Sequence, residues 1–88
     1  MGILVFKRTI NGVAGQHYVS SPGGVSVLEI VAVHRTGAQY DKVALTNLNN
    51  GVTRQWAYNN FLKRIQFPTA LPFTSSDEKV HVIYKTIV

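Results

Sequence analysis

The chain has 88 residues and no cysteine, and 45% of its residues are hydrophobic while 15% are charged. This length predicts a single domain over residues 1–88 with a single core, and the apolar content excludes a disordered tail. The absence of cysteine excludes disulfides and thiolate metal sites, and it favours a cytoplasmic protein. No apolar run approaches the length of a membrane-spanning helix.

The net charge is the strongest signal in the composition. Nine Lys and Arg residues against four Asp and Glu residues give a formal charge of +5. Such an excess favours polyanionic partners, namely nucleic acid or an acidic protein surface. A charge kept only for solubility is the alternative, because net charge informs about association and not about fold.

The first part of the chain predicts strands separated by turn residues. Residues 3–10, ILVFKRTI, are rich in β-branched and aromatic side chains. Asn11-Gly12 suits a two-residue hairpin turn into a return strand over residues 13–20. The SSPGG segment, residues 20–24, then breaks the chain. Residues 25–35, VSVLEIVAVHR, are largely apolar on both faces, which predicts a strand that bends across two sheets.

Turn pairs also divide the middle of the chain. Thr36-Gly37 leads into a strand over residues 39–48, and Asn50-Gly51 is expected to make a hairpin with residues 52–58, VTRQWAY. Residues 59–65, NNFLKRI, predict one short helical turn, for which Asn59 is a suitable N-cap.

The last part is a loop with two prolines over residues 66–78, followed by a strand over residues 79–88, KVHVIYKTIV. The order of elements predicts a mainly β fold with five or six short strands in an antiparallel meander and one short helical turn. Small barrels and rolls are the matching architectures, and the helical turn after the Trp-containing strand favours an SH3-like barrel over an OB-like one.

Residues 25–65 resemble the SH3-like small β-barrel modules of bacteria, plasmids and phages. The shared pattern is a long apolar strand with a Thr-Gly turn, a second strand, and a Trp-containing strand that leads into a short helical turn: VSVLEIVAVHRTG, YDKVALTNL and VTRQWAYNNFLKRI. The resemblance implies a nucleic-acid-binding module, a protein-interaction module, or an accessory protein of a phage or mobile element. The family also includes the plasmid-borne dihydrofolate reductase, whose Val-Gln-Ile-Tyr motif VTRQWAY does not match, so the resemblance implies no catalytic residue.

Basic and aromatic residues make the candidate site, because nucleic-acid binding needs cations for phosphates and rings for stacking. Arg54, Trp56 and Tyr58 share a face of an ideal strand, so a solvated Arg54 favours an exposed Trp56. Alternatively, Trp56 fills the core and Arg54 lies at its rim. The predicted nucleic-acid-binding residues are Lys7, Arg8, Arg35, Arg54, Trp56, Tyr58, Lys63 and Arg64.

Other polar residues give no catalytic motif. Glu29 interrupts an apolar strand, and it has three interpretations: an ion pair with Arg, a solvent-facing bend, or a site with a raised pKa. His17, His34 and His81 lie on different predicted strands without ligand spacing, so we expect no metal and no cofactor. No phosphate loop, nucleophile elbow or paired acid motif is present, which predicts a protein that is not an enzyme.

The final strand is apolar on both faces. It either lies beside the first strand and closes a barrel, or it is an exposed edge that pairs with another chain. The sequence therefore predicts a small basic binding module, with nucleic acid as the first partner. The alternative is a protein-interaction or assembly module that oligomerises through the C-terminal edge strand.

Overall fold

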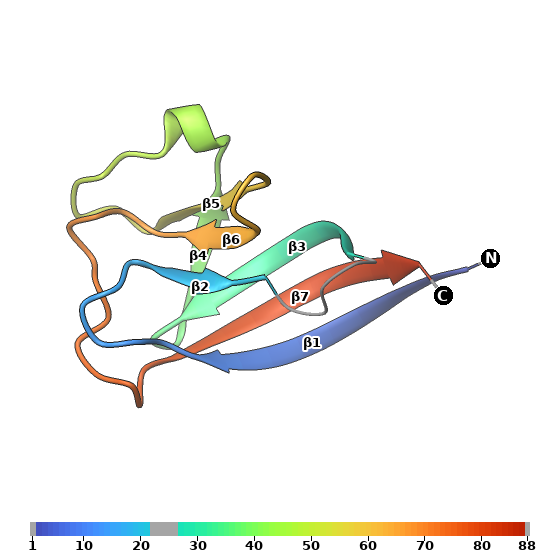
Figure 1. Ribbon diagram of the computed structural model, residues 1–88, viewed down its shortest axis with the longest axis horizontal. Helices are drawn as coiled ribbons and strands as arrows, with labels where there is room; N and C mark the ends of the chain where they lie inside the picture. The colour runs from blue at the N-terminus through green and yellow to red at the C-terminus, as the bar shows by residue number, and fades with distance from the viewer. Residues whose placement is uncertain (1, 22–26, 88) are drawn as a thin grey trace.

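Figure 1 shows a computed structural model that describes residues 2–21 and 27–87. These residues form seven strands and a short 3₁₀ helix, η2 (Leu45–Asn47). The mainly β prediction is confirmed, with seven strands instead of five or six. The strands are β1 (Ile3–Asn11), β2 (Tyr18–Ser20), β3 (Val27–Arg35), β4 (Ala38–Lys42), β5 (Gln55–Asn59), β6 (Arg64–Gln66) and β7 (Lys79–Ile87).

The strands form one curled sheet, a half-barrel, in the order β1-β7-β3-β4-β5-β6-β2. The C-terminal strand β7 pairs with β1 from Ile3↔Ile87 to Asn11↔Lys79, and its other side pairs with β3. The prediction that it lies beside the first strand is confirmed, but the described sheet stays open, so this strand does not close a barrel. The alternative of a C-terminal edge strand is wrong. Both hydrogen-bonding edges of β7 are therefore paired. The two edges of the described sheet are β1 and β2.

The three longest strands, β1, β7 and β3, run side by side as an extended arm (Figure 1). We call these three strands the arm. β1 begins and β7 ends at its tip, and β2, β4, β5 and β6 gather at its other end. The pairing of β3 with β7 shifts register between Val27 and Glu29 and again between Ile30 and Ala32, which marks β-bulges or similar irregularities. The strand stays within one curled sheet and does not pass between two sheets as predicted.

The first Asn-Gly pair does not make a hairpin. β1 continues through Asn11 and pairs with β7, and residues 13–20 do not pair with it. Gly12 is buried instead, and its amide donates to the carbonyl oxygen of Glu78 at 2.8 Å. A Cβ atom at this position would lie 2.4 Å from the ring of Phe73. Close packing against Phe73, and not a turn, accounts for this glycine.

We expect Gly12→Ala to destabilise the protein by about 1–3 kcal/mol, because Phe73 is a core side chain that must shift to admit the new methyl group. Urea unfolding followed by circular dichroism measures the loss. Gly51→Ala is the control, since its Cβ would meet only the exposed side chain of Asn49 at 3.2 Å. Equal stability of the two variants would contradict the packing role of Gly12.

The second Asn-Gly pair also fails to make a hairpin. β4 and β5 are parallel, with Asp41 opposite Gln55, and residues 43–54 with η2 form the connection between them. A parallel pair needs about a dozen residues to cross over, which this segment supplies. The asparagine side chains accept backbone hydrogen bonds instead. Asn49 Oδ1 accepts from the Gly51 amide at 2.9 Å, and Asn50 Oδ1 accepts from the distant Thr69 amide at 3.2 Å.

The Thr36-Gly37 turn is confirmed. Both residues have positive φ, 51° and 77°, and Arg35 pairs with Ala38 on either side of them. Positive φ at both central residues is what a two-residue hairpin turn requires. The break predicted at residues 20–24 lies mostly outside the described residues.

The helical turn predicted for residues 59–65 is a β-turn region between two antiparallel strands. β5 and β6 pair through Asn59↔Arg64, and residues 60–63 connect them. Asn59 Oδ1 accepts from the amides of Phe61 and Leu62, both at 3.0 Å, as an N-cap would. Lys63 then adopts a φ of 54°, which ends the turn, and Ile65 enters the core. We call residues 59–64 the β5–β6 turn.

Candidate nucleic-acid interface

Two of the eight predicted site residues are buried, which contradicts their place in an interface. Trp56 is 0% exposed and lies in the core, so the interpretation with an exposed Trp56 is wrong. Arg35 is 3% exposed and lies between the rings of Phe67 and Phe73, at 4.9 and 4.3 Å from their centroids. Its Nε donates to Glu78 Oε1 at 3.0 Å.

The four exposed cations of the predicted set do not form one cluster. Lys7 and Arg8 are neighbours on β1, so they point to opposite faces of the arm. Arg54 directly precedes β5, whereas Lys63 follows it. The length of that strand separates the two cations by about 17 Å. The structure therefore does not gather all the predicted cations on one patch.

Tyr58 and Lys63 do meet, at a cavity of about 640 Å³ between the start of β3 and the β5–β6 turn. We call this space the hairpin cavity. Its aliphatic wall comes from β3, and Tyr58 supplies an aromatic ring from β5. The described residues that line it are Ser21, Val27, Leu28, Glu29, Ile30, Tyr58, Asn60 and Lys63.

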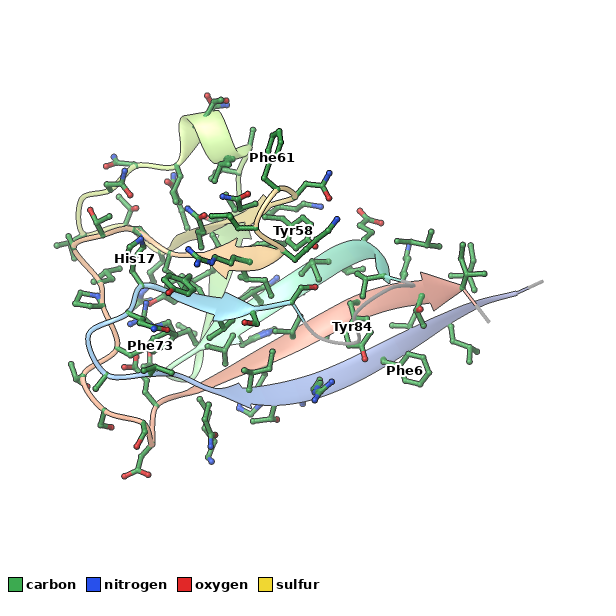
Figure 2. The ribbon with its side chains drawn as sticks, in the orientation of Figure 1. Phe6, His17, Tyr58, Phe61, Phe73 and Tyr84 are labelled. Atoms are coloured by element: carbon green, nitrogen blue, oxygen red, sulfur yellow. The ribbon has the colours of Figure 1, made fainter. Side chains whose placement is uncertain are left out.

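Phe61 stands at the tip of the β5–β6 turn with 98% of its surface exposed. Figure 2 shows Phe61 and Tyr58 on the same part of the molecule, where β5 turns into β6. Lys63 Nζ donates to Asn60 Oδ1 at 2.9 Å, which fixes the cation within the turn. Phe61 was not among the predicted site residues, because the helical turn predicted for residues 59–65 gave no reason to expect it to be exposed.

The other face of the turn carries a second basic and aromatic pair. The guanidinium carbon of Arg64 lies 3.9 Å from the centroid of the Tyr18 ring, and the ring of His17 meets Tyr18 edge-on at 5.7 Å. Arg64 pairs with Asn59 while Tyr58 pairs with Ile65, so Arg64 and Tyr58 point to opposite faces. Tyr18 was missed because its contact with Arg64 depends on the pairing of β2 with β6.

Glu29 is paired with two cations. Lys42 Nζ lies 3.5 Å from Glu29 Oε2, and Lys85 Nζ lies 3.6 Å from Glu29 Oε1. The residue also occupies the irregular stretch of β3 where the register shifts. Glu29 therefore forms ion pairs, but with lysines and not with the arginine that the sequence predicted.

Two of the three histidines lie side by side. His34 on β3 is directly opposite His81 on β7, and Nδ1 of His81 lies 2.9 Å from Oγ1 of Thr9. The sequence placed them on different strands, and only the register shows that they face each other. Among residues 2–21 and 27–87, no group of three His, Cys, Asp or Glu side chains converges in a way that would hold a metal ion.

Comparisons with known proteins add no relative: no family model, curated protein or solved structure matches the chain. The likeness to SH3-like modules therefore rests on the sequence pattern. In the part of the chain that the structure describes, no helix has the length and apolar character needed to cross a membrane.

Proposed function

We propose that this chain is a small non-enzymatic binding module that binds single-stranded nucleic acid at the β5–β6 turn. The observation that carries the proposal is that Tyr58 and Lys63 line one cavity, while Phe61 stands exposed on the turn beside it, in a protein of charge +5. The likeness to SH3-like modules of phages and mobile elements belongs to the same proposal, and it favours an accessory role.

Stacking provides the first half of this recognition. A fully exposed ring has no packing role in the folded chain, and Phe61 offers both of its faces to solvent. Aromatic side chains stack on unpaired bases with about 1–3 kcal/mol per base. A duplex keeps its bases stacked and paired, so a site that works through exposed rings favours a single strand. Tyr58 in the cavity wall supplies a second ring for a neighbouring base.

Charge provides the other half. Lys63 lines the cavity, where its ammonium group can bind a phosphate. The positive charge of the two lysines that pair with Glu29 exceeds the single negative charge of its carboxylate. Glu29 is also an acceptor on the cavity wall for a base amino group, as carboxylates are for cytosine. The hairpin cavity and the turn beside it therefore combine two rings, one lysine and one acceptor within reach of a short nucleotide segment.

The Phe61 series tests the stacking role. Phe61→Ala and Phe61→Leu are expected to weaken binding of a labelled single-stranded oligonucleotide by roughly 5- to 100-fold, because both remove the ring. Phe61→Tyr keeps the ring and should retain affinity. Fluorescence anisotropy measures all three, and a side chain this exposed is replaced without disturbing the core. If Phe61→Leu binds as well as the unaltered protein, the ring does not stack.

A matched pair of charge deletions locates the phosphate contact. Lys63→Ala should weaken binding about 3- to 10-fold and make the salt dependence shallower by about one phosphate contact. Arg54→Ala removes the same charge from the far end of β5 and should change affinity less than about twofold. Equal losses in the two variants would mean that net charge alone attracts the nucleic acid.

A further inference from the structure

The tip of the arm exposes a sheet edge that soluble proteins ordinarily protect. β1 has β7 as its only neighbour among the described strands, and eight of its nine residues are exposed. Its first half is apolar: Ile3, Leu4, Val5 and Phe6 are between 41% and 62% exposed. A long apolar edge presents unpaired backbone donors and acceptors to any other strand.

The apolar side chains of this edge occupy both faces of the sheet. Leu4 and Phe6 lie on the face of Tyr84, whose ring centroid is 5.9 Å from that of Phe6 (Figure 2). Ile3 and Val5 lie on the opposite face. Stacking of another surface on the sheet would cover only one of these faces. In contrast, a strand that pairs alongside β1 contacts side chains on both faces of the sheet.

β1 is complementary to a second copy of itself when the pairing is antiparallel and centred on Val5. Val5 then faces Val5 of the second copy, Leu4 faces Phe6 twice, and Ile3 faces Lys7 twice. Each Lys7 lies about 13 Å along the strand from its copy, which exceeds the Debye length of roughly 8 Å at physiological salt. A register centred on Phe6 instead brings the two Lys7 side chains diagonally to about 7–8 Å. Charge therefore selects the register that also pairs the apolar residues.

The area available sets the strength of such a contact. The four apolar side chains expose on the order of 400 Å² per chain, given about 150–250 Å² for a large side chain. Two copies with their backbone edges approach the lower limit of roughly 1,200 Å² for specific interfaces. An interface of this size is typical of weak, reversible association.

We propose that the chain forms a symmetric homodimer in which β1 of one copy pairs antiparallel with β1 of another, centred on Val5. The sheet then continues across the two-fold axis, and the edge is removed from both copies. The lysine at position 7 and the arginine at position 8 lie at the ends of the paired segment, where they remain solvated. This surface is independent of the hairpin cavity.

Sedimentation equilibrium of the full chain from about 1 to 200 µM tests the proposal. The unaltered protein should dimerise in this range. Val5→Lys places two lysines directly opposite each other and should weaken the dimer at least roughly tenfold. Val52→Lys adds the same charge at a residue that is 82% exposed and lies outside the arm, and it should leave the dimer unchanged.

A mixing experiment tests whether the strand that pairs with β1 comes from a second copy of the chain, and in which register. Val5→Lys and Val5→Asp should each dimerise at least roughly tenfold more weakly than the unaltered chain. An equimolar mixture should associate more tightly than either variant alone, because the opposite charges face each other. A protein that stays monomeric at all concentrations would overturn the proposal and leave the edge to a strand of another protein. A Val5→Lys variant that dimerises as tightly as the unaltered chain, or a mixture that associates no more tightly than the separate variants, would also overturn it.

Discussion

Glu78→Ala is expected to destabilise the protein by about 3–5 kcal/mol, and this is one of the two largest effects that the structure predicts. The carboxylate accepts from Arg35 Nε at 3.0 Å and from the Thr74 amide at 3.1 Å. Without it, the guanidinium stays buried between two phenylalanine rings with no counterion. Within the described residues its Nη1 already has no hydrogen-bond partner. Thermal unfolding followed by circular dichroism should show a midpoint lowered by more than about 10 °C.

The double variant Arg35→Met with Glu78→Leu is the control for this prediction. Replacing a whole buried ion pair by apolar side chains of similar size is often neutral, whereas removal of one partner is not. The double variant should therefore regain most of the loss. A Glu78→Ala variant within about 1 kcal/mol of the unaltered protein would show that solvent reaches Arg35.

Trp56→Ala should cost about 3–5 kcal/mol, because it empties the largest fully buried side chain of the core. Urea unfolding gives the loss, and Trp56→Phe, which retains an aromatic ring, should cost less. Trp56 is the single tryptophan of the chain, so its fluorescence should resist quenching by acrylamide in the folded state. Quenching as efficient in the folded as in the unfolded protein would contradict the buried position.

Trp56→Phe also separates the core role from the interface role that the sequence left open. A buried tryptophan cannot stack on a base, so the variant should bind single-stranded oligonucleotides as the unaltered protein does. A loss of affinity comparable to that of Phe61→Leu would place Trp56 in the interface.

The strands were predictable where the pattern is local. Residues 3–10 and 79–88 are dense in β-branched residues, and Thr36-Gly37 is a turn because both residues adopt positive φ. The two Asn-Gly pairs were wrongly predicted to be hairpin turns, because these residues make tertiary contacts instead. Gly12 leaves room for the ring of Phe73, and Asn50 binds the backbone of Thr69. Neither contact has a signal in the neighbouring sequence.

Some residues of the candidate site were predictable from the sequence, but their arrangement in space was not. Lys63 and Tyr58 were identified from the basic and aromatic residues around the turn, and they meet at the cavity. The strand β5 begins at Gln55, so the alternation that linked Arg54 to Trp56 does not extend to Arg54. Phe61 could be identified as an exposed residue only once the structure showed that its turn connects two strands. Such positions depend on strand boundaries and register, which a single sequence does not specify.

Fluorescence anisotropy of single- and double-stranded oligonucleotides, titrated with the unaltered protein at two salt concentrations, tests the central claim most directly. The account predicts micromolar or tighter binding of the single strand that weakens as salt rises, with weaker binding of the duplex. Equal affinity for both would contradict recognition by exposed rings. Flat curves at low salt would contradict nucleic-acid binding by this protein altogether.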